Sequence, residues 1–210
     1  VSVLALLVAL LLGSLMGILR TTPHRGLVLL GNAWTELFRN IPLLVQMFLW
    51  YFVIPEFIPP LKHWMVSTDP VYAQFVAAVL CLGLFTSARI AEQVRAGVQS
   101  LPQGQRYAGQ ALGLTQPQVY RYVLLPMAFR IVIPPLTSES MNIIKNSSVA
   151  FAVSVAELTM FAMQAGEETS RNVEMYLAVT LLYFVSAFAI NRVMMVVEQR
   201  VRVPGMIGGK

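Results

Sequence analysis

The sequence predicts an all-α integral membrane protein, a helical bundle of about five transmembrane helices with a cytoplasmic loop between the third and the fourth. Three observations lead to this fold class. Hydrophobic residues make up 57% of the 210-residue chain and charged residues only 12%. The apolar residues form runs long enough to cross a bilayer, and the basic residues collect in alternate loops. We treat residues 1–210 as one transmembrane domain.

The composition excludes most soluble enzymes. A soluble domain carries roughly twice this fraction of charged residues, and a chain of this size cannot bury so much apolar surface in one core, so lipid must cover part of it. The formal charge of +5 could suggest nucleic acid, but the basic residues form no stripe, and we expect no nucleic-acid binding. Cys81 is the only cysteine, and His24 and His63 lack metal-ligand spacing, so we expect no metal site.

A membrane-spanning helix needs about 20 apolar residues, and five segments approach this length. They are Val1–Leu19, about Ile41–Ile54, Val71–Ala88, about Met127–Ile144, and Met175–Val197. An amphipathic stretch over Gly26–Asn40 precedes the second span, and the third continues as a more polar helix to Arg95. We expect the natural N-terminus to be missing, because residue 1 is Val and the opening run has neither a charged flank nor a signal-peptide cleavage site.

Charge gives the expected orientation, because basic loop residues stay on the cytoplasmic side. Here they follow the first, third and fifth spans: Arg20, Arg25, Arg95, Arg106, Arg121, Arg200, Arg202 and Lys210. The alternate loops carry Glu56, Asp69, Glu167, Glu168 and Glu174 against only Lys62 and Arg171. We therefore expect the N-terminus outside, the C-terminus in the cytoplasm and an odd number of crossings.

The segment Met127–Glu174 allows two interpretations. One crossing over about Met127–Ile144 can be followed by an irregular, partly re-entrant return lined by protein or water, because free backbone polar groups cannot face lipid. Alternatively, the segment crosses twice. The second interpretation gives six spans and breaks the charge parity, so we favour five.

The cytoplasmic loop Ala96–Tyr122 predicts two helices joined by a sharp turn. Gln105–Leu112 forms the first, which Gly113 closes because glycine readily takes the left-handed conformation. The run Thr115-Gln116-Pro117-Gln118 then starts the second, with an N-cap threonine, a first-turn proline and a capping-box glutamine. On this pattern alone, an ordinary amphipathic loop is the alternative.

The loop resembles a family signature. Ala108-Gly109-Gln110-Ala111-Leu112-Gly113-Leu114, followed by Leu124-Leu125-Pro126, is similar to the cytoplasmic loop of ABC importer permeases, in which an "EAA" stretch precedes a Gly and a later Leu-Pro. In that family the loop forms the coupling helices that seat in a groove of the ATP-binding subunit. The resemblance assigns ATPase coupling to Tyr107, Ala108, Gly109, Ala111, Leu112, Gly113, Leu114 and Pro126. Tyr107 replaces the usual Glu, so we carry over no salt bridge there, and Gly109 replaces the second Ala.

Further segments resemble the polar amino-acid branch of this family. They are Glu36–Gln46, Ala91–Arg95 and Lys145–Ser148, and the resemblance extends over about residues 10–205. The amino-acid sequences of three segments are most similar to those of glutamate/aspartate importer permeases: Leu82–Thr86, Gln99–Pro102 and Pro134–Glu139. Glutamate or aspartate is therefore the expected solute, with another polar amino acid such as glutamine as the alternative.

The resemblance implies an alternating-access importer in the bacterial inner membrane. Two permease subunits, either two copies of this chain or this chain with a paralogue, form the pathway within membrane lipid. An ATP-binding subunit dimer carries ATP and Mg²⁺, and a periplasmic solute-binding protein delivers the amino acid. The chain has no G-x-x-x-x-G-K-[ST] loop, since Gly208-Gly209-Lys210 lacks the hydroxyl residue. We expect it to be no enzyme and to bind no cofactor.

Charged residues within spans are the candidate solute contacts, because they are costly in lipid and face a partner or a water-filled cavity. Arg89 could hold a solute carboxylate through two parallel hydrogen bonds. Alternatively it is a topology or gating residue, because about 27 Å of helix separates it from Val71. The proposed solute-binding residues are Arg89, Ser138, Glu139 and Lys145. The proposed structural or gating residues are Glu36, Arg39, Pro42, Gln46, Glu92 and Arg95.

Two relationships among these residues are expected. Arg89, Glu92 and Arg95 share one helix face, and Glu36 and Arg39, one turn apart, should form a structural ion pair. Glu139 and Lys145 should flank a break in the fourth span, where transport sites often lie, or else fasten the fold.

Two other classes of membrane protein compete with this interpretation. An ion-coupled carrier or channel should show an internal repeat or a selectivity filter, and a membrane-embedded enzyme needs a cluster of catalytic side chains. We find none of these in the sequence. Co-purification separates the classes, because only an importer subunit should bring an ATPase with it.

Overall fold

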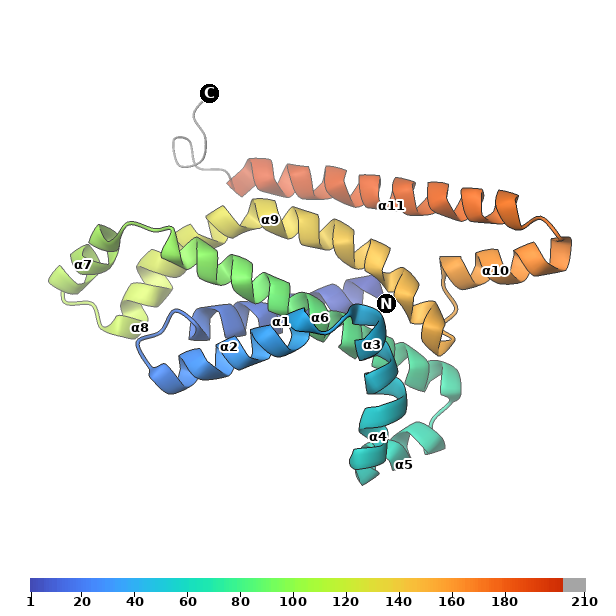
Figure 1. The fold of residues 1–210 in the computed structure, drawn as a ribbon. Helices are drawn as coiled ribbons and strands as arrows, with labels where there is room; N and C mark the ends of the chain where they lie inside the picture. Colours follow the sequence, from blue (N-terminus) through green and yellow to red (C-terminus); the bar gives the residue numbers. More distant parts are fainter. Residues whose placement is uncertain (202–210) are drawn as a thin grey trace.

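The computed structural model describes residues 1–201, which contain helices and no strand, in agreement with the all-α fold class. The basic residues Arg202 and Lys210 and the Gly208–Lys210 run lie outside the described residues. Four long helices form the body and lie roughly side by side (Figure 1). They are α1 (Ser2–Leu19), α6 (Pro70–Gln99), α9 (Leu125–Asn146) and α11 (Asn172–Val201).

Helices α1 and α6 pack against each other through small residues. The buried residues of α1 recur at every fourth position: Ala5, Ala9, Gly13 and Gly17. A Cβ atom added at Gly13 would lie 2.7 Å from the Cβ of Ile90, and one at Gly17 would lie 2.6 Å from the Cβ of Val94. Small residues allow the backbones of membrane helices to approach this closely. Both contacts advance by four residues in the same direction, so α1 and α6 run parallel.

The parallel course of α1 and α6 requires the chain between them to return to the end of the body where it began. Helix α2 (Arg25–Asn40) packs on both α1 and α6. After a bend of 102° the chain continues through α3 (Leu43–Phe48), the π-helical turn η1 (Leu49–Val53) and α4 (Ile54–Phe57), and then α5 (Pro59–Ser67) leads to α6. The 15 residues from 43 to 57 give only about 22 Å of helix.

The number of spans agrees with the predicted five when the bent pair is included. Within residues 1–201, four helical segments are long and apolar enough to cross a membrane, and a fifth is added if the bent pair of α2 and α3–α4 counts as one span. The predicted second span at Ile41–Ile54 begins at the Ile41–Pro42 break and consists of α3, η1 and the start of α4, and α2 is the amphipathic stretch predicted before it.

The predicted fourth span is part of a longer continuous helix. Helices α8 (Gln116–Val119), η2 (π-helical, Tyr120–Leu124), α9 and η3 (3₁₀-helical, Ser147–Val153) follow one another as a 38-residue segment. The return predicted after Ile144 contains η3, which ends this segment, and then α10 (Leu158–Thr169). Helix α10 has 12 residues and is too short to span. This favours one crossing over two. Glu139 lies inside α9 and not beside a break, so the expectation that it flanks one was wrong.

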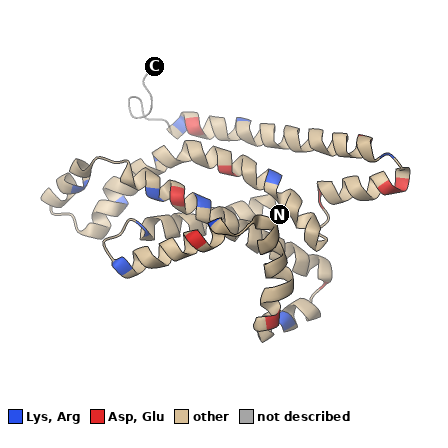
Figure 2. Ribbon diagram, viewed as in Figure 1, with Lys and Arg blue, Asp and Glu red and all other residues tan. Residues whose placement is uncertain are grey.

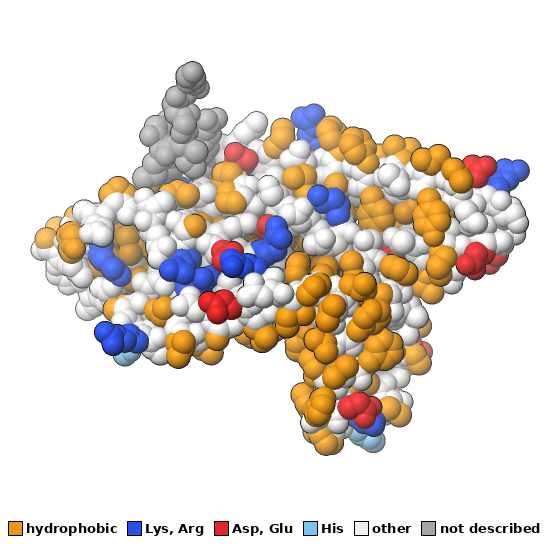
Figure 3. Space-filling model, in the orientation of Figure 1, with side chains coloured by type: hydrophobic (Ala, Val, Ile, Leu, Met, Phe, Trp, Pro, Cys, Tyr) orange, Lys and Arg blue, Asp and Glu red, His pale blue; other side chains and the backbone are white. Residues whose placement is uncertain are grey.

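Hydrophobic and charged side chains gather on different parts of the surface. Figure 3 shows hydrophobic side chains over α3–α5, and charged side chains over the middle of the face where α2, α6 and α9 lie. In α11 only Val179 is buried, so this helix offers nearly its whole apolar surface to lipid or to another subunit. Figure 2 shows basic residues near α7 (Gln103–Ala111) and α8 at one end of the molecule. It shows acidic residues at the other end of the molecule, where α10 ends.

Candidate functional site

Helices α7 and α8 with the turn between them, residues 103–119, form a projection at one end of the body (Figure 1) that we call the hook. Gly113 closes α7 in the left-handed conformation with φ +79°. The N–H of Leu114 donates to the carbonyl of Gly109 at 3.1 Å, and that of Gly113 donates to Gln110 at 2.9 Å. These two bonds define a Schellman C-cap. The turn predicted at Gly113 is therefore present.

The second helix of the hook starts at Thr115, as predicted. The Oε1 of Gln118 accepts a hydrogen bond from the N–H of Thr115 at 2.8 Å, and Pro117 lies in the first turn. This helix is not separate, because it continues through η2 into α9. Helix α6 in turn extends to Gln99, so the hook is shorter than the predicted loop Ala96–Tyr122, and it is continuous with a spanning helix.

The exposed side of the hook carries apolar side chains. The exposed fraction is 82% for Leu112 and 61% for Tyr107, and Ala108 and Ala111 are also exposed. Gly109 faces inward, where an added Cβ would lie 3.1 Å from Val119 Cγ2. An apolar tip outside the spanning helices is the kind of surface that a partner protein covers.

We call the face where α2, α6 and α9 lie the charged face. On it, Arg89 of α6 and Glu139 of α9 form an ion pair with two hydrogen bonds. Arg89 Nε donates to Glu139 Oε2 at 2.8 Å, and Arg89 Nη2 donates to Oε1 at 3.1 Å. Gln93 Nε2 adds a third bond to Oε1 at 3.2 Å. The side chain of Glu139 is 5% exposed, whereas that of Arg89 is 42% exposed. Two of the five guanidinium N–H groups are thus used, and the Nη1 group makes no hydrogen bond within residues 1–201.

Within residues 1–201, the other predicted site residues near this face form no hydrogen bond or ion pair with Arg89 or Glu139. Glu92 pairs with Arg39 of α2, so the expected Glu36–Arg39 pair was wrong, because α6 places a carboxylate closer to Arg39. Arg95 has a buried Nε atom without a hydrogen-bond partner among the described residues. Ser138 and Lys145 are exposed on α9.

Two residues predicted as structural lie at the break between α2 and α3. Gln46 Nε2 donates to the carbonyl oxygens of Phe38 at 2.7 Å and Ile41 at 2.9 Å. Pro42 occupies the N-cap position of α3 with an extended ψ of 139°. Together they fasten the bend of the second span to the end of α2.

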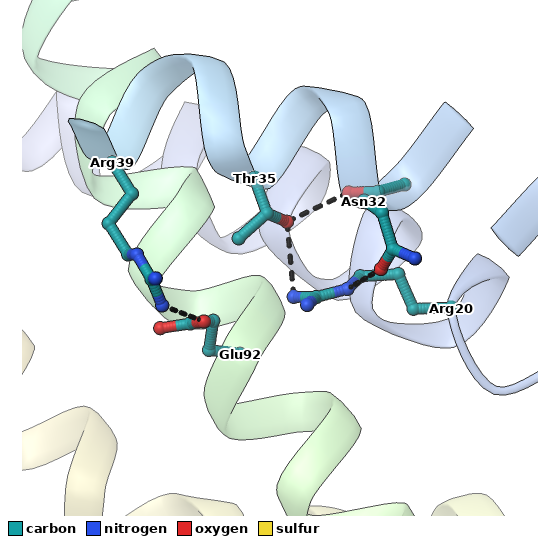
Figure 4. A network of polar contacts seen from close by, with 6 residues as sticks. Arg20, Asn32, Thr35, Arg39 and Glu92 are labelled. Carbon is teal, nitrogen blue, oxygen red and sulfur yellow. Dashed lines mark hydrogen bonds and ion pairs between the residues drawn. The ribbon is translucent and has the colours of Figure 1, made fainter. Parts of the chain in front are cut away.

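Sequence reasoning missed the contacts of Arg20, which was used only as a topology residue. Arg20 follows α1 and is 9% exposed. Its Nε donates to Asn32 Oδ1 at 2.8 Å and its Nη1 to Thr35 Oγ1 at 3.1 Å, both on α2 (Figure 4). Burial lowers the pKa of the Arg20 guanidinium, and the positive charge of Arg95 lowers it further. Arginine nevertheless stays protonated in proteins, so a buried positive charge joins α1 to α2.

The described residues 1–201 contain no group of three or more His, Cys, Asp or Glu side chains that could hold a metal ion. The charged face carries the ion pairs Arg39–Glu92 and Arg89–Glu139. A fixed guanidinium on an exposed face can bind a carboxylate, and an apolar hook can bind a partner.

An all-helical body with helices long and apolar enough to cross a membrane, and with a projecting hook, is typical of a membrane transport permease. The chain belongs to the family described as binding-protein-dependent transport system inner membrane component, which matches residues 9–203.

Comparison with known proteins supports this family and narrows it. The chain is 48% identical over 211 aligned positions to the glutamate/aspartate import permease protein GltJ of Escherichia coli (strain K12), covering 100% of this chain and 86% of that protein. It is 36% identical over 184 positions to the probable glutamine ABC transporter permease protein GlnM of Bacillus subtilis (strain 168), covering 88% of this chain and 80% of that protein.

Solved structures show the same fold. A crystal structure of an amino acid ABC transporter with histidines matches with a TM-score of 0.80 and 29% identity, covering 95% of this chain and 88% of the matched chain. An inward-facing structure of the MetNI methionine ABC transporter matches with a TM-score of 0.74 over 96% of this chain and 91% of the matched chain. At 20% identity, the second match shows the fold alone.

Proposed function

We propose that this chain is the transmembrane subunit of an ATP-driven importer for an acidic amino acid, glutamate or aspartate. The observation that carries this proposal is the 48% identity over the whole chain to a permease named for glutamate and aspartate import. Glutamine is the alternative solute, because a relative 36% identical is named as a probable glutamine permease.

The solute contact that we propose is Arg89, positioned by Glu139. The buried carboxylate fixes the guanidinium through Nε and Nη2, so Nη1 and the second hydrogen of Nη2 can donate to a solute carboxylate in the parallel geometry that guanidinium favours. Lys145 lies six residues, about 9 Å of helix, along α9 from Glu139. Its positive charge can offset the additional negative charge of an acidic solute, and the exposed Ser138 can donate a hydrogen bond.

The partner that we propose for the hook is a separate ATPase, which binds ATP and Mg²⁺. Support comes from the exposed apolar side chains of Tyr107 and Leu112 and from the cap that holds the turn at Gly113. We also propose a solute-binding protein on the other side of the membrane, and the family description, which names a binding-protein-dependent transport system, supports it. We assign no catalytic step to this chain.

The permease partner that we propose is a paralogue of this chain. Escherichia coli O6:H1 has two proteins named as glutamate/aspartate import permeases, GltJ and GltK. The chain is 48% identical to the first but only 26% identical to the second. Two distinct permeases of one named activity in one strain favour a heterodimer over two copies of this chain.

Reconstitution tests the function and the pairing together. Proteoliposomes containing the chain, its paralogue and the ATPase, with ATP inside and binding protein outside, should take up labelled glutamate, and unlabelled aspartate should compete better than glutamine, arginine or histidine. Vesicles with the chain as the only permease should show little uptake. Transport without the ATPase would disprove the importer assignment, and stronger competition by glutamine would disprove the acidic solute.

We propose that the hook lies in the cytoplasm, with the N-terminus outside and the C-terminus inside. Support comes from the basic residues at the hook end, among them Arg25, Arg106 and Arg121, since positive loops stay on the cytoplasmic side. In a Cys81→Ala background, a Leu112→Cys variant should react with a membrane-impermeant thiol reagent in inverted vesicles and not in intact spheroplasts. Labelling in spheroplasts would reverse this orientation.

A further inference from the structure

Tyr120 is the point where three separate segments meet. It is the first residue of η2, where the hook passes into α9, and it is 8% exposed. Its hydroxyl donates to the carbonyl oxygen of Thr21 in the turn between α1 and α2. The same hydroxyl accepts a hydrogen bond from Arg106 Nη2 of α7 at 3.1 Å. The guanidinium carbon of Arg106 also lies 5.5 Å from the centroid of the tyrosine ring.

Packing covers part of this junction, where Tyr120 belongs to a hydrophobic cluster with Val119 and Leu124 against which Ile18 of α1 packs, and leaves part of it open. A cavity of about 260 Å³ lies there, lined by Tyr120, Arg106 and Thr21 together with residues from the end of α6. The Nε atom of Arg106 is buried and has no hydrogen-bond partner within residues 1–201. The hydrogen bond from the Tyr120 hydroxyl to Thr21 therefore joins the hook to the α1–α2 turn beside this cavity, and the bond from Arg106 holds the same hydroxyl from within the hook.

The backbone at Tyr120 departs from regular α-helix. The segment Tyr120–Leu124 is π-helical, and single π-helical turns within α-helices frequently lie at functional sites. A movement of the hook about this turn would reach the Thr21 carbonyl directly through the tyrosine hydroxyl.

From Thr21 the contacts continue into the body. The preceding residue, Arg20, donates to Asn32 and Thr35 of α2 (Figure 4). Helix α2 packs along α6, the helix that carries the Arg89 that we propose as the solute contact. The α1–α2 turn is thus fastened to the helix that borders the charged face.

We propose that Tyr120 is a positioning residue that transmits movement of the hook to the α1–α2 turn, so that ATP hydrolysis in the partner subunit changes the solute pathway. This inference rests on the proposed function as an importer subunit. Tyr120 contacts neither solute nor nucleotide. Its role is to keep the hook and the α1–α2 turn moving as one unit.

The test separates transport from hydrolysis. Tyr120→Phe keeps the aromatic ring and its contact with Arg106 but removes both hydrogen bonds of the hydroxyl. In proteoliposomes with the ATPase, the paralogue and the binding protein, we expect the number of glutamate molecules taken up per ATP hydrolysed to fall about fivefold or more, as losing one or two buried hydrogen bonds predicts. ATPase retention and hydrolysis should remain near the wild-type level.

Tyr122→Phe is the matched control. Tyr122 lies two residues away, is 61% exposed, and its hydroxyl makes no hydrogen bond among the described residues. This variant should keep the wild-type ratio of uptake to hydrolysis. Arg106→Met, which removes only one of the two bonds to the hydroxyl, should give an intermediate ratio, and it provides the test if Tyr120→Phe fails to assemble.

Three results would overturn the inference. They are a wild-type ratio in both Tyr120→Phe and Arg106→Met, an equal loss of uptake and hydrolysis, or a loss that follows only the amount of assembled complex. If wild-type vesicles show no ATP-driven uptake, the proposed function itself fails, and the inference fails with it.

Discussion

Exchanging Arg89 and Glu139 together for glutamine should lower ATP-driven glutamate uptake by roughly 10- to 100-fold while the complex still assembles. The reason is the loss of a charge-assisted contact to a carboxylate, worth about 1.5–3 kcal/mol. The double variant is the informative one, because removing Arg89 alone would leave the buried Glu139 carboxylate unpaired, which typically costs about 3–5 kcal/mol of stability. Uptake is measured in proteoliposomes at subsaturating glutamate.

The neighbouring ion pair gives the control. Arg39→Gln with Glu92→Gln removes a pair of opposite charges that joins α2 to α6, with exposed side-chain fractions of 50% and 38%. Exposed pairs contribute about 0–1 kcal/mol, so uptake should stay within a few-fold of the wild type. Equal uptake by the Arg89/Glu139 double variant and the wild type would show that Arg89 only fastens α6 to α9.

Competition identifies the solute group at Arg89. If the guanidinium holds the side-chain carboxylate, the double variant should lose its preference for glutamate over glutamine. If it holds the α-carboxylate, uptake of both solutes should fall together. Both results place Arg89 at the solute, and they differ in which end of the amino acid faces α6.

Local features of this structure could be read from the sequence. The turn at Gly113 and the helix start at Thr115 depend on residues within one or two turns of each other, so their residue types specify the conformation. The long apolar runs and the alternation of basic loops likewise predicted the spans, because both depend on contact with lipid and water and not on which helices are neighbours.

Contacts between distant segments could not be predicted. Arg39 and Glu92 are 53 residues apart, Arg89 and Glu139 are 50 apart, and Tyr120 and Thr21 are 99 apart. These contacts are set by the rotation and depth at which helices pack. In α1 and α6 that depth follows from glycines fitting against Ile90 and Val94. The spacing of Glu36 and Arg39 suggested a local pair, but packing brought Arg39 to a different carboxylate.

Replacing Gly113 by valine should separate the ATPase from this chain. A side chain at φ +79° costs about 1–2 kcal/mol even for an ordinary residue, and a β-branched residue is a genuine outlier there. An added Cβ would meet nothing within 4 Å, so the effect comes from the backbone and not from a clash. The exposed Tyr107 and Leu112 would then no longer be held in the arrangement that the ATPase binds.

Two further variants make this prediction specific. Gly113→Asn should restore binding in large part, because asparagine tolerates the left-handed conformation. Gly104→Val, also in open space but without a positive φ, should bind the ATPase nearly as well as the wild type. We expect at least a tenfold loss of co-purified ATPase and of uptake for Gly113→Val, from a free-energy cost of about 1.4 kcal/mol or more. If Gly113→Val and Gly104→Val retain the ATPase equally, the shape of the turn does not determine docking.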